Sequence, residues 1–295
     1  MTTAAPKKWQ FWRSNRPSTQ LSVFIGAEAA WACCADKPDA VRFYGHQHDW
    51  KVLWGKVAAD FGSAEVQLVL GAGSYQIIAA DKPAIPEDEI PQALLWSVKD
   101  MVATPASNIH LDYFEFPSAT NNKLQVVVTD KTQMMQLAQA VVDNGMLLSG
   151  ISIEELMPAN LFGVEAQARL VICHVPKEEL LLTVVRDGEL WMQRRLRGYS
   201  ELDSLTAEAL QFGIADNLSL EIQRSMDFFE SQLRQAPVTS IELLVGGEQQ
   251  QLLAQLVTAN FNQPVNVIEA GDIGGKMAAL GLLEMQRIQR GSKHD

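Results

Sequence analysis

The sequence predicts an α/β protein that is made of two related halves. The first observation is a repeated hairpin pattern. Residues 21–35 form two apolar runs separated by Gly26, and residues 168–195 show the same shape with an Asp187-Gly188 turn, which is a strong hairpin signal. The second observation is that strand-like runs alternate with amphipathic helical patterns after each hairpin, as in α/β proteins. Two such hairpins are expected to face each other across a cleft.

The first half continues with a strand, a helix and a strand. Residues 40–46 alternate as a strand does, and apolar residues recur at helical spacing over residues 49–61. Asp49 is placed to cap the N-terminus of this helix and Gly62 to end it. Residues 65–70 then predict the next strand.

A small α+β insert is predicted within the first half, at about residues 82–150. A short strand at residues 74–80 precedes it, and the loop at residues 81–91 holds three prolines and four acidic residues, a composition typical of a subdomain change. The expected order inside the block is helix, strand, strand, helix and strand, at residues 90–102, 113–116, 123–129, 130–144 and 147–153.

The second half is predicted to continue from its hairpin with helices and two more strands. These elements are expected at residues 204–213, 216–233, 241–245, 248–260, 265–268 and 277–290, with Asp216 or Asn217 capping the long helix. That helix carries one apolar stripe: Leu218, Ile222, Met226, Phe229 and Leu233. The stripe favours packing on the protein's own sheet, and a coiled coil or partner helix is the alternative. Residues 272–276 are expected to form a turn.

Composition restricts the class of protein. The formal net charge is −11, which argues against a nucleic-acid partner. The three cysteines, Cys33, Cys34 and Cys173, have neither disulfide-framework nor metal-site spacing, which fits a reducing compartment. There is no apolar run near the roughly 20 residues that cross a bilayer, and the N-terminus lacks a signal-peptide pattern. These observations predict a cytoplasmic protein.

The N-terminal segment at residues 1–20 is a basic, aromatic leader. One interpretation is a flexible tail, as is common at termini. The other is contact with an anionic membrane surface, because bases attract the lipid and aromatic rings favour the interface. Four basic residues alone give weak adhesion. The residues expected at such a surface are Lys7, Lys8, Trp9, Trp12, Arg13 and Arg16.

Several stretches resemble one protein family. Residues 218–231, which read LSLEIQRSMDFFES, the Leu-Leu-Val-Gly-Gly run at 243–247, and residues 98–101 and 111–114 are similar to PilM-like, actin-like proteins of type IV pilus assembly. Within that family the likeness is to the MshI branch, which serves the mannose-sensitive haemagglutinin (MSHA) pilus. The resemblance extends over residues 21–281.

This resemblance implies an actin-like (ribonuclease H-like) duplicated fold with two lobes and a small α+β insert in the first lobe. The lobes are expected at residues 21–163, including the insert, and 164–295. In the family, ATP lies between the lobes, held by an Asp-Ile-Gly hairpin in each lobe and by a Gly-Gly strand end. Here the two hairpins read Phe24-Ile25-Gly26 and His174-Val175-Pro176.

These departures predict a cleft that has lost its nucleotide chemistry. Phe24 cannot ligate magnesium, Trp31 stands where the family has a lysine, and Pro176 removes an N–H donor. The prediction is a pseudo-ATPase with no cofactor, no metal and no catalytic residue. Gly26, Gly246 and Gly247 are then remains of a nucleotide site. The alternative is an active or residual ATP-binding ATPase of the actin and sugar-kinase superfamily.

Other chemistry has little support in the residues. The His46-Gln47-His48-Asp49 run is a conceivable metal site, but the cysteines do not join it. His174 lies in an apolar strand, which favours a core residue.

The resemblance also implies a partner. In the family, the cytosolic N-terminal peptide of a PilN-like inner-membrane protein lies in a groove between the first lobe and its insert. That groove is expected here between residues 75–80 and the 82–150 block. A scaffold held at the inner membrane through this partner is therefore the first hypothesis. An enzyme is the second, and a lipid-binding module acting through the leader is the third.

Overall fold

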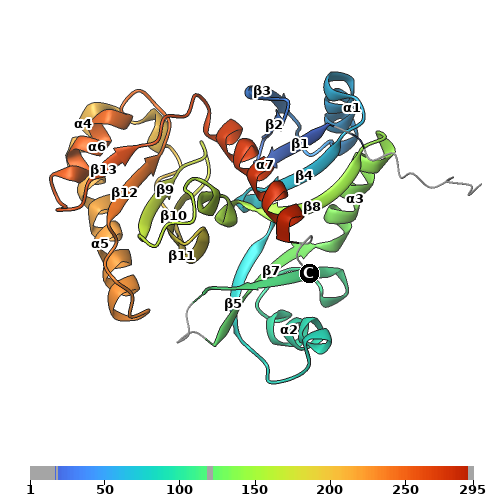
Figure 1. Ribbon diagram of the computed structural model, residues 1–295, viewed down its shortest axis with the longest axis horizontal. Coiled ribbons are helices and arrows are strands. Elements are labelled where there is room, and N and C mark those ends of the chain that lie inside the picture. Colours follow the sequence, from blue (N-terminus) through green and yellow to red (C-terminus); the bar gives the residue numbers. More distant parts are fainter. Residues whose placement is uncertain (1–16, 18, 118–121, 292–295) are drawn as a thin grey trace, which may run out of the picture.

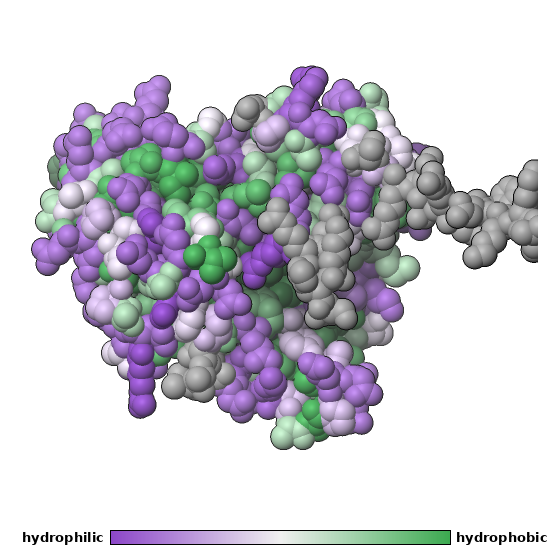
Figure 2. Space-filling view, viewed as in Figure 1, coloured by the Kyte–Doolittle hydropathy of each residue, from purple (hydrophilic) through white to green (hydrophobic). Residues whose placement is uncertain are grey.

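The computed structural model describes residues 17, 19–117 and 122–291 of the chain. The leader residues singled out for membrane contact, Lys7, Lys8, Trp9, Trp12, Arg13 and Arg16, lie outside the described residues. The described residues form three sheets flanked by helices (Figure 1). Hydrophilic residues cover most of the face in Figure 2, and apolar residues gather in patches.

The first sheet contains the predicted first hairpin. Its strands are β1 (Gln20–Ile25), β2 (Ala29–Cys34), β3 (Lys37–Gly45), β4 (Glu65–Leu70) and β8 (Leu147–Ile153), in the order β3-β2-β1-β4-β8. The first three strands pair antiparallel, whereas β4 and β8 join in parallel. Parallel pairing needs a crossover, and the helices α1 (Trp50–Phe61) and α3 (Lys131–Asp143) supply it.

The second sheet repeats this arrangement. Its strands are β9 (Arg169–Cys173), β10 (Leu180–Arg186), β11 (Glu189–Leu196), β12 (Ser240–Leu244) and β13 (Val265–Val267), in the order β11-β10-β9-β12-β13. Its helices are α4 (Ala207–Ala209), α5 (Ala215–Ser231) and α6 (Gln250–Thr258). Three antiparallel strands followed by two parallel ones in both sheets show the duplication that the repeated hairpins predict.

The third sheet is small and has its own core. It consists of β5 (Gln76–Asp81), β7 (Lys123–Asp130) and β6 (Ile109–Glu115) in that order, and α2 (Ile90–Val98) packs against it. Below, "insert" means this sheet with α2. "First lobe" means the first sheet with α1 and α3, and "second lobe" means the second sheet with α4 to α6. The short 3₁₀-helices are Ala72–Ser74, Glu87–Glu89, Ala106–Asn108, Glu154–Asn160 and Leu202–Ser204.

Sheet membership differs from the block expected at residues 82–150. β5 precedes that block and yet belongs to the small sheet, whereas β8 lies inside the block and yet pairs with β4. The reason is that α3 carries the chain back across the first sheet, where β8 extends it in parallel. The exact domain boundaries stay a prediction.

Aspartates cap α1 and α3, and the cap at Asp49 is the one that the sequence predicts. The Asp49 carboxylate accepts a hydrogen bond from the Val52 N–H at 3.0 Å, and Asp130 accepts one from the Gln133 N–H at 2.9 Å. Gly62, directly after α1, has a φ of 68°, a conformation that glycine adopts without strain.

The start of α5 differs from the expected cap at Asp216 or Asn217. α4, a π-helical segment (Leu210–Ile214) and α5 follow one another directly, with a kink at Gly213, where φ is 102°. The cap lies further upstream, because the Thr206 hydroxyl accepts a hydrogen bond from the Ala209 N–H at 3.3 Å. The apolar stripe of α5 is buried against the second sheet, as predicted, so it is not available to a partner helix.

The last helix, α7 (Ile273–Gly291), packs on the first sheet although the sequence assigns it to the second lobe (Figure 1). Small residues permit this close contact: a Cβ at Gly274 would lie 2.4 Å from the Trp31 ring, and one at Gly281 would lie 2.1 Å from Ser22 Oγ. The turn expected at residues 272–276 is the first turn of α7, because the Gly275 N–H donates to Asp272 Oδ1 at 3.0 Å.

Candidate functional site

The two predicted hairpin turns meet between the lobes. Gly26 follows β1, and the turn between β9 and β10 carries Glu178. The Ala27 N–H donates to Glu178 Oε1 at 3.2 Å, which joins the lobes. A Cβ added at Gly26 or at Gly71 would lie 3.2 Å from the same oxygen. The glycines therefore let a carboxylate approach the backbone of the first turn.

Glu178 occupies a position that suits an anion. The backbone N–H groups of Ala27 and Ala72 and the Arg195 guanidinium favour its ionised form, but burial is the largest effect and raises the pKa of this carboxyl. Its Oε2 atom is buried and has no hydrogen-bond partner among the described residues. Backbone amides at a glycine turn form an anion-binding concavity, and here a side chain of the second lobe fills it.

A buried ionic cluster joins the lobes near this contact. Arg195 Nη2, from β11, lies 2.9 Å from Glu154 Oε2 and 2.8 Å from Glu155 Oε1. Both glutamates directly follow β8 and are almost fully buried. The Tyr75 hydroxyl, from the residue directly before β5, donates to Glu155. The first lobe, the second lobe and the edge of the insert are therefore linked through one guanidinium.

The charges in this cluster perturb one another. Burial raises the pKa of Glu154 to about 8, although Arg195 acts in the opposite direction. Burial and the neighbouring Glu155 raise the pKa of the Tyr75 hydroxyl. Burial alone would lower the pKa of Arg195, but Glu154 and Glu155 together raise it. One guanidinium thus faces three buried carboxyl groups, and burial holds the pKa of Glu154 above its ordinary value. Sequence reasoning missed Glu154, Glu155, Glu178 and Arg195, although an acidic pair directly after an apolar strand is an unusual pattern.

Phe24 and His174, which lie at the two hairpins, are core residues. Phe24 is fully buried between the lobes, and its ring centroid lies 5.8 Å from that of Trp31. His174 is also fully buried. Its Nε2 lies 3.2 Å from the Ser200 carbonyl oxygen, and its Nδ1 is 3.8 Å from Asp203 Oδ1. Burial lowers the pKa of His174, which fits the core role that the sequence favours.

Gly246 and Gly247 follow β12, and backbone packing explains Gly247. Gly247 has a φ of 93°, and a Cβ there would lie 2.1 Å from the Asp203 carbonyl oxygen. Glycine is therefore required for the turn itself. Neither of the two grooves described below is lined by Gly26, Gly246 or Gly247.

The histidine run at residues 46–49 serves the structure of the first hairpin. The His48 N–H donates to His46 Nδ1 at 3.0 Å, and His46 Nε2 lies 3.0 Å from the Gly26 carbonyl oxygen. Both ring nitrogens of His46 are thus hydrogen-bonded within the chain. Across the described ranges, no group of three or more potential ligands is arranged to hold a metal ion.

An apolar groove lies between the insert and the first lobe. Its volume is about 180 Å³, and its walls are β6, β7, β8 and neighbouring residues. β6 and β8 are outer strands of their sheets. The groove expected between residues 75–80 and the insert does not form there, because β5 pairs with β7 inside the insert. The lining residues are Leu70, His110, Asp112, Tyr113, Phe114, Val127, Thr129, Met134, Ile151, Ser152, Ile153 and Leu156.

Within the described parts of the chain, no helix combines the length and the apolar character that crossing a bilayer requires.

Comparison with known proteins gives structural matches. No protein-family model matches the sequence, and no curated protein sequence matches it either. A PilM–PilN type IV pilus biogenesis complex aligns with a TM-score of 0.63 at 16% identity, covering 90% of this chain and 98% of that chain. The cytoplasmic domain of EpsL, an inner-membrane component of the Vibrio cholerae type II secretion system, gives 0.54 at 12% identity over 90% and 95%.

A third match comes from a Bacteroides thetaiotaomicron protein that is described as having an actin-like ATPase fold and unknown function. It aligns with a TM-score of 0.51 at 11% identity, covering 89% of this chain and 95% of that chain. At these identities the likeness concerns the fold. The chain has the actin-like ATPase fold, a mixed α/β structure with several sheets, and the predicted fold class is confirmed.

Proposed function

We propose that the protein is a docking scaffold of a type IV pilus assembly machine, of the MshI type that serves MSHA pili. It would hold the cytosolic N-terminal tail of a PilN-like inner-membrane protein and so lie at the cytoplasmic side of that membrane. The similar PilM structure is a complex with PilN, and the EpsL domain belongs to an inner-membrane component. The observation that carries the proposal is the apolar groove between β6 and β8.

This groove has the features of a site for an extended peptide. β6 and β8 each end a sheet, so their outer edges offer backbone hydrogen bonds to an added strand. Ile151 contributes an apolar wall and is 43% exposed. Asp112 adds a carboxylate at the same groove, which would attract a basic side chain of the tail. Main-chain pairing would supply affinity, and the apolar lining would select side chains.

We further propose that the scaffold works without hydrolysing ATP. The Glu178 carboxylate accepts a hydrogen bond from the Ala27 N–H of the first hairpin turn. A polyphosphate bound at this turn would therefore be repelled by a nearby negative charge. Phe24 and Pro176 supply no metal ligand and no N–H donor at the two hairpins. An active or residual ATP-binding ATPase is the competing function.

Peptide binding tests the docking role. The N-terminal tail of the PilN-like protein from the same organism is labelled and titrated with the full chain, and fluorescence anisotropy is recorded. Ile151→Lys should weaken binding by at least about tenfold, because it places a charge in an apolar groove. Leu147→Lys is the matched control, since Leu147 is 41% exposed on the same strand but does not line the groove. Absence of binding to the natural chain, or equal loss in both variants, contradicts the proposal.

Thermal unfolding in the presence of magnesium and ATP tests whether the protein binds the nucleotide that hydrolysis would require. A ligand that binds the folded state raises the melting temperature, so the natural chain should show no shift. A rise of several degrees would instead support the ATP-binding alternative.

The leader's membrane contact is tested separately, by flotation of the chain with anionic liposomes before and after removal of residues 1–16.

A further inference from the structure

A second groove lies between the insert and the second lobe. Two cavities of about 850 Å³ and about 570 Å³ share Gln193 and Arg194 of β11, so they adjoin each other along this strand. The smaller part lies between β11 and β5, the outer strands of their sheets (Figure 1), and the larger part lies between β11, α5 and residues 123–125 of β7. The docking groove proposed above uses the other end of β7, at Val127 and Thr129, on the same face of the insert. The two sites share no lining residue.

The second groove is basic although the chain as a whole carries a net charge of −11. The described residues that line its larger part include no carboxylate, and its smaller part adds Arg195 and Arg197 together with Glu155 and Glu179. The positive charge of the groove is therefore a local feature, because the overall composition of the chain is acidic. The basic residues of the larger part are Lys123, Arg194, Arg224 and Arg234.

Neutralisation of this charge from within the chain is incomplete. Glu221 is shared by two guanidinium groups, at 2.9 Å from Arg194 and 2.5 Å from Arg224. Lys123 and Arg234 form no ion pair with the described residues. One carboxylate facing two guanidinium groups and two further cations leaves the groove with excess positive charge.

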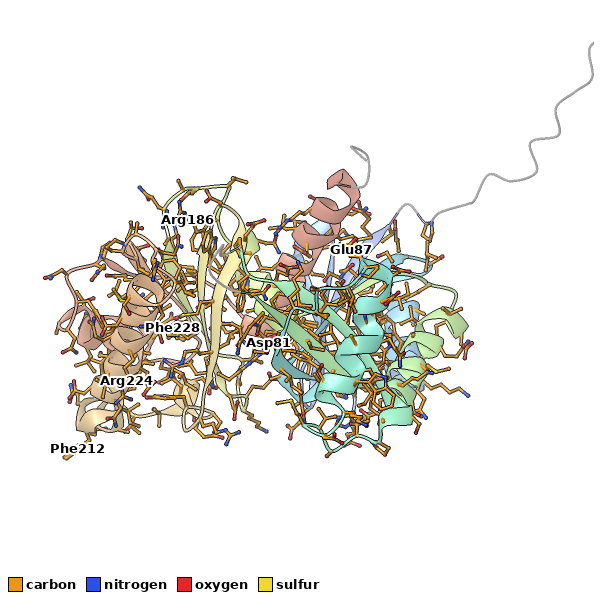
Figure 3. The ribbon with its side chains drawn as sticks, turned by 90° about the horizontal axis from the view of Figure 1, so that it is seen from below. Asp81, Glu87, Arg186, Phe212, Arg224 and Phe228 are labelled. Carbon is orange, nitrogen blue, oxygen red and sulfur yellow. The ribbon has the colours of Figure 1, made fainter. Side chains whose placement is uncertain are left out.

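Apolar walls accompany the cations. Phe228 is 47% exposed, and it follows Arg224 along α5 (Figure 3). Trp191 is held in place because its Nε1–H donates to the Arg186 carbonyl oxygen at 3.2 Å, and the Arg186 guanidinium lies 5.3 Å from its ring centroid. Phe116 of the insert lines the same cavity. Fixed aromatic walls beside guanidinium groups are typical of binding hot spots.

We propose that this second groove binds an extended acidic segment of a partner protein, one that also carries aromatic or aliphatic side chains. Its carboxylates would accept paired hydrogen bonds from Arg194 and Arg224. The free edges of β5 and β11 would pair with its backbone. A long polyanion such as nucleic acid fits less well, because the net negative charge of the chain repels it beyond the groove, whereas screening confines a short segment's interactions to within about 8 Å.

Direct binding tests this proposal. The probe is a labelled synthetic peptide in which glutamate alternates with leucine and phenylalanine, and its control has lysine in place of glutamate. The full chain should bind the glutamate peptide and not the lysine peptide, and the affinity should fall as salt is added. Arg224→Glu should weaken binding by at least about tenfold. Arg287→Glu makes the same charge change at an exposed site on α7 and should have little effect.

A second pair of variants tests the apolar wall. Phe228→Ala should weaken binding, whereas Phe212→Ala should not, since Phe212 is 91% exposed and outside the groove (Figure 3). Ile151→Lys should leave this binding unchanged, which separates the result from that of the docking groove. The proposal is overturned if the glutamate peptide does not bind, if the control variants lose as much affinity, or if single-stranded DNA binds more tightly than the peptide.

Discussion

At the scale of single residues, Glu154 couples the stability of the fold to pH. Burial raises the pKa of its carboxyl from an ordinary 4.5 to about 8. The folded state therefore binds more protons than the unfolded state between these values. The stabilisation that the protonated Glu154 carboxyl gives the folded state is fully present below pH 4.5 and is lost as pH rises through about 8.

We expect Glu154→Gln to reduce this pH dependence. Glutamine is neutral at every pH and keeps an oxygen that can accept a hydrogen bond from Arg195. The variant has no carboxyl to titrate at this position, so it should lose less stability than the natural chain between pH 5 and pH 8. Urea denaturation at a series of pH values measures the difference. Glu87→Gln is the control, because Glu87 is exposed (Figure 3). Parallel pH profiles for Glu154→Gln and the natural chain would exclude this role.

Residue identity alone indicates what the side chains at the two hairpins can bind, but it does not reveal which distant residues contact them. Phe24 and Pro176 can be interpreted from their chemistry, since neither offers a metal ligand or an N–H donor. Glu178 cannot be recognised in the same way, because its contact with Ala27 joins residues 151 positions apart in the sequence. The Arg195 cluster was missed for the same reason: its members come from three separate stretches of the chain.

At the scale of elements, α7 depends on glycine for its contact with the first sheet. A Cβ at Gly281 would lie 2.1 Å from Ser22 Oγ and 2.7 Å from Val69 Cγ2. Ser22 is fully buried on β1 and cannot move aside without disturbing the sheet. The helix and the strand must therefore separate if this glycine gains a side chain.

We expect Gly281→Ala to destabilise the protein by about 1–3 kcal/mol, the usual cost of overpacking a core. Leu283→Ala, on the same helix, should have a much smaller effect, because Leu283 is 46% exposed. Chemical denaturation of both variants measures the two values. A Gly281→Ala variant as stable as the natural chain would show that α7 packs less tightly than described.

The sequence predicts helix caps and turns well, because each depends on a few neighbouring residues. It predicts less well which strands pair and which sheet a helix covers. The Asp49 cap and the Asp187-Gly188 turn each lie where the sequence indicated. Strand pairing is a long-range property: the pattern of β8 indicates a strand but not that β4 is its neighbour. The same holds for α7, whose amphipathic pattern does not specify which sheet it covers.

At the scale of the whole molecule, buried and exposed ion pairs join the lobes with unequal strength. Arg195 is largely buried with Glu154 and Glu155, whereas Lys177 and Glu28 form a pair at 3.0 Å in which both side chains are mostly exposed. Removal of one member of a buried pair leaves an uncompensated charge. An exposed pair exchanges easily with water.

We expect Arg195→Met to cost about 3–5 kcal/mol of stability, and Lys177→Met to cost less than about 1 kcal/mol. Hydrogen exchange should also rise at the junction of the lobes in the first variant and not in the second. Denaturation and exchange measured by mass spectrometry provide both readings. Similar losses in the two variants would mean that the buried cluster does not dominate the contact between the lobes.

The face of the small three-stranded sheet opposite α2 is shared by the two grooves. Val127 of β7 lines the docking groove, and Gln125, two residues before it on the same strand, lines the second groove. Two residues along a strand span about 7 Å. Guests in the two grooves are therefore expected to crowd each other, and titrating either peptide in the presence of the other would measure this antagonism.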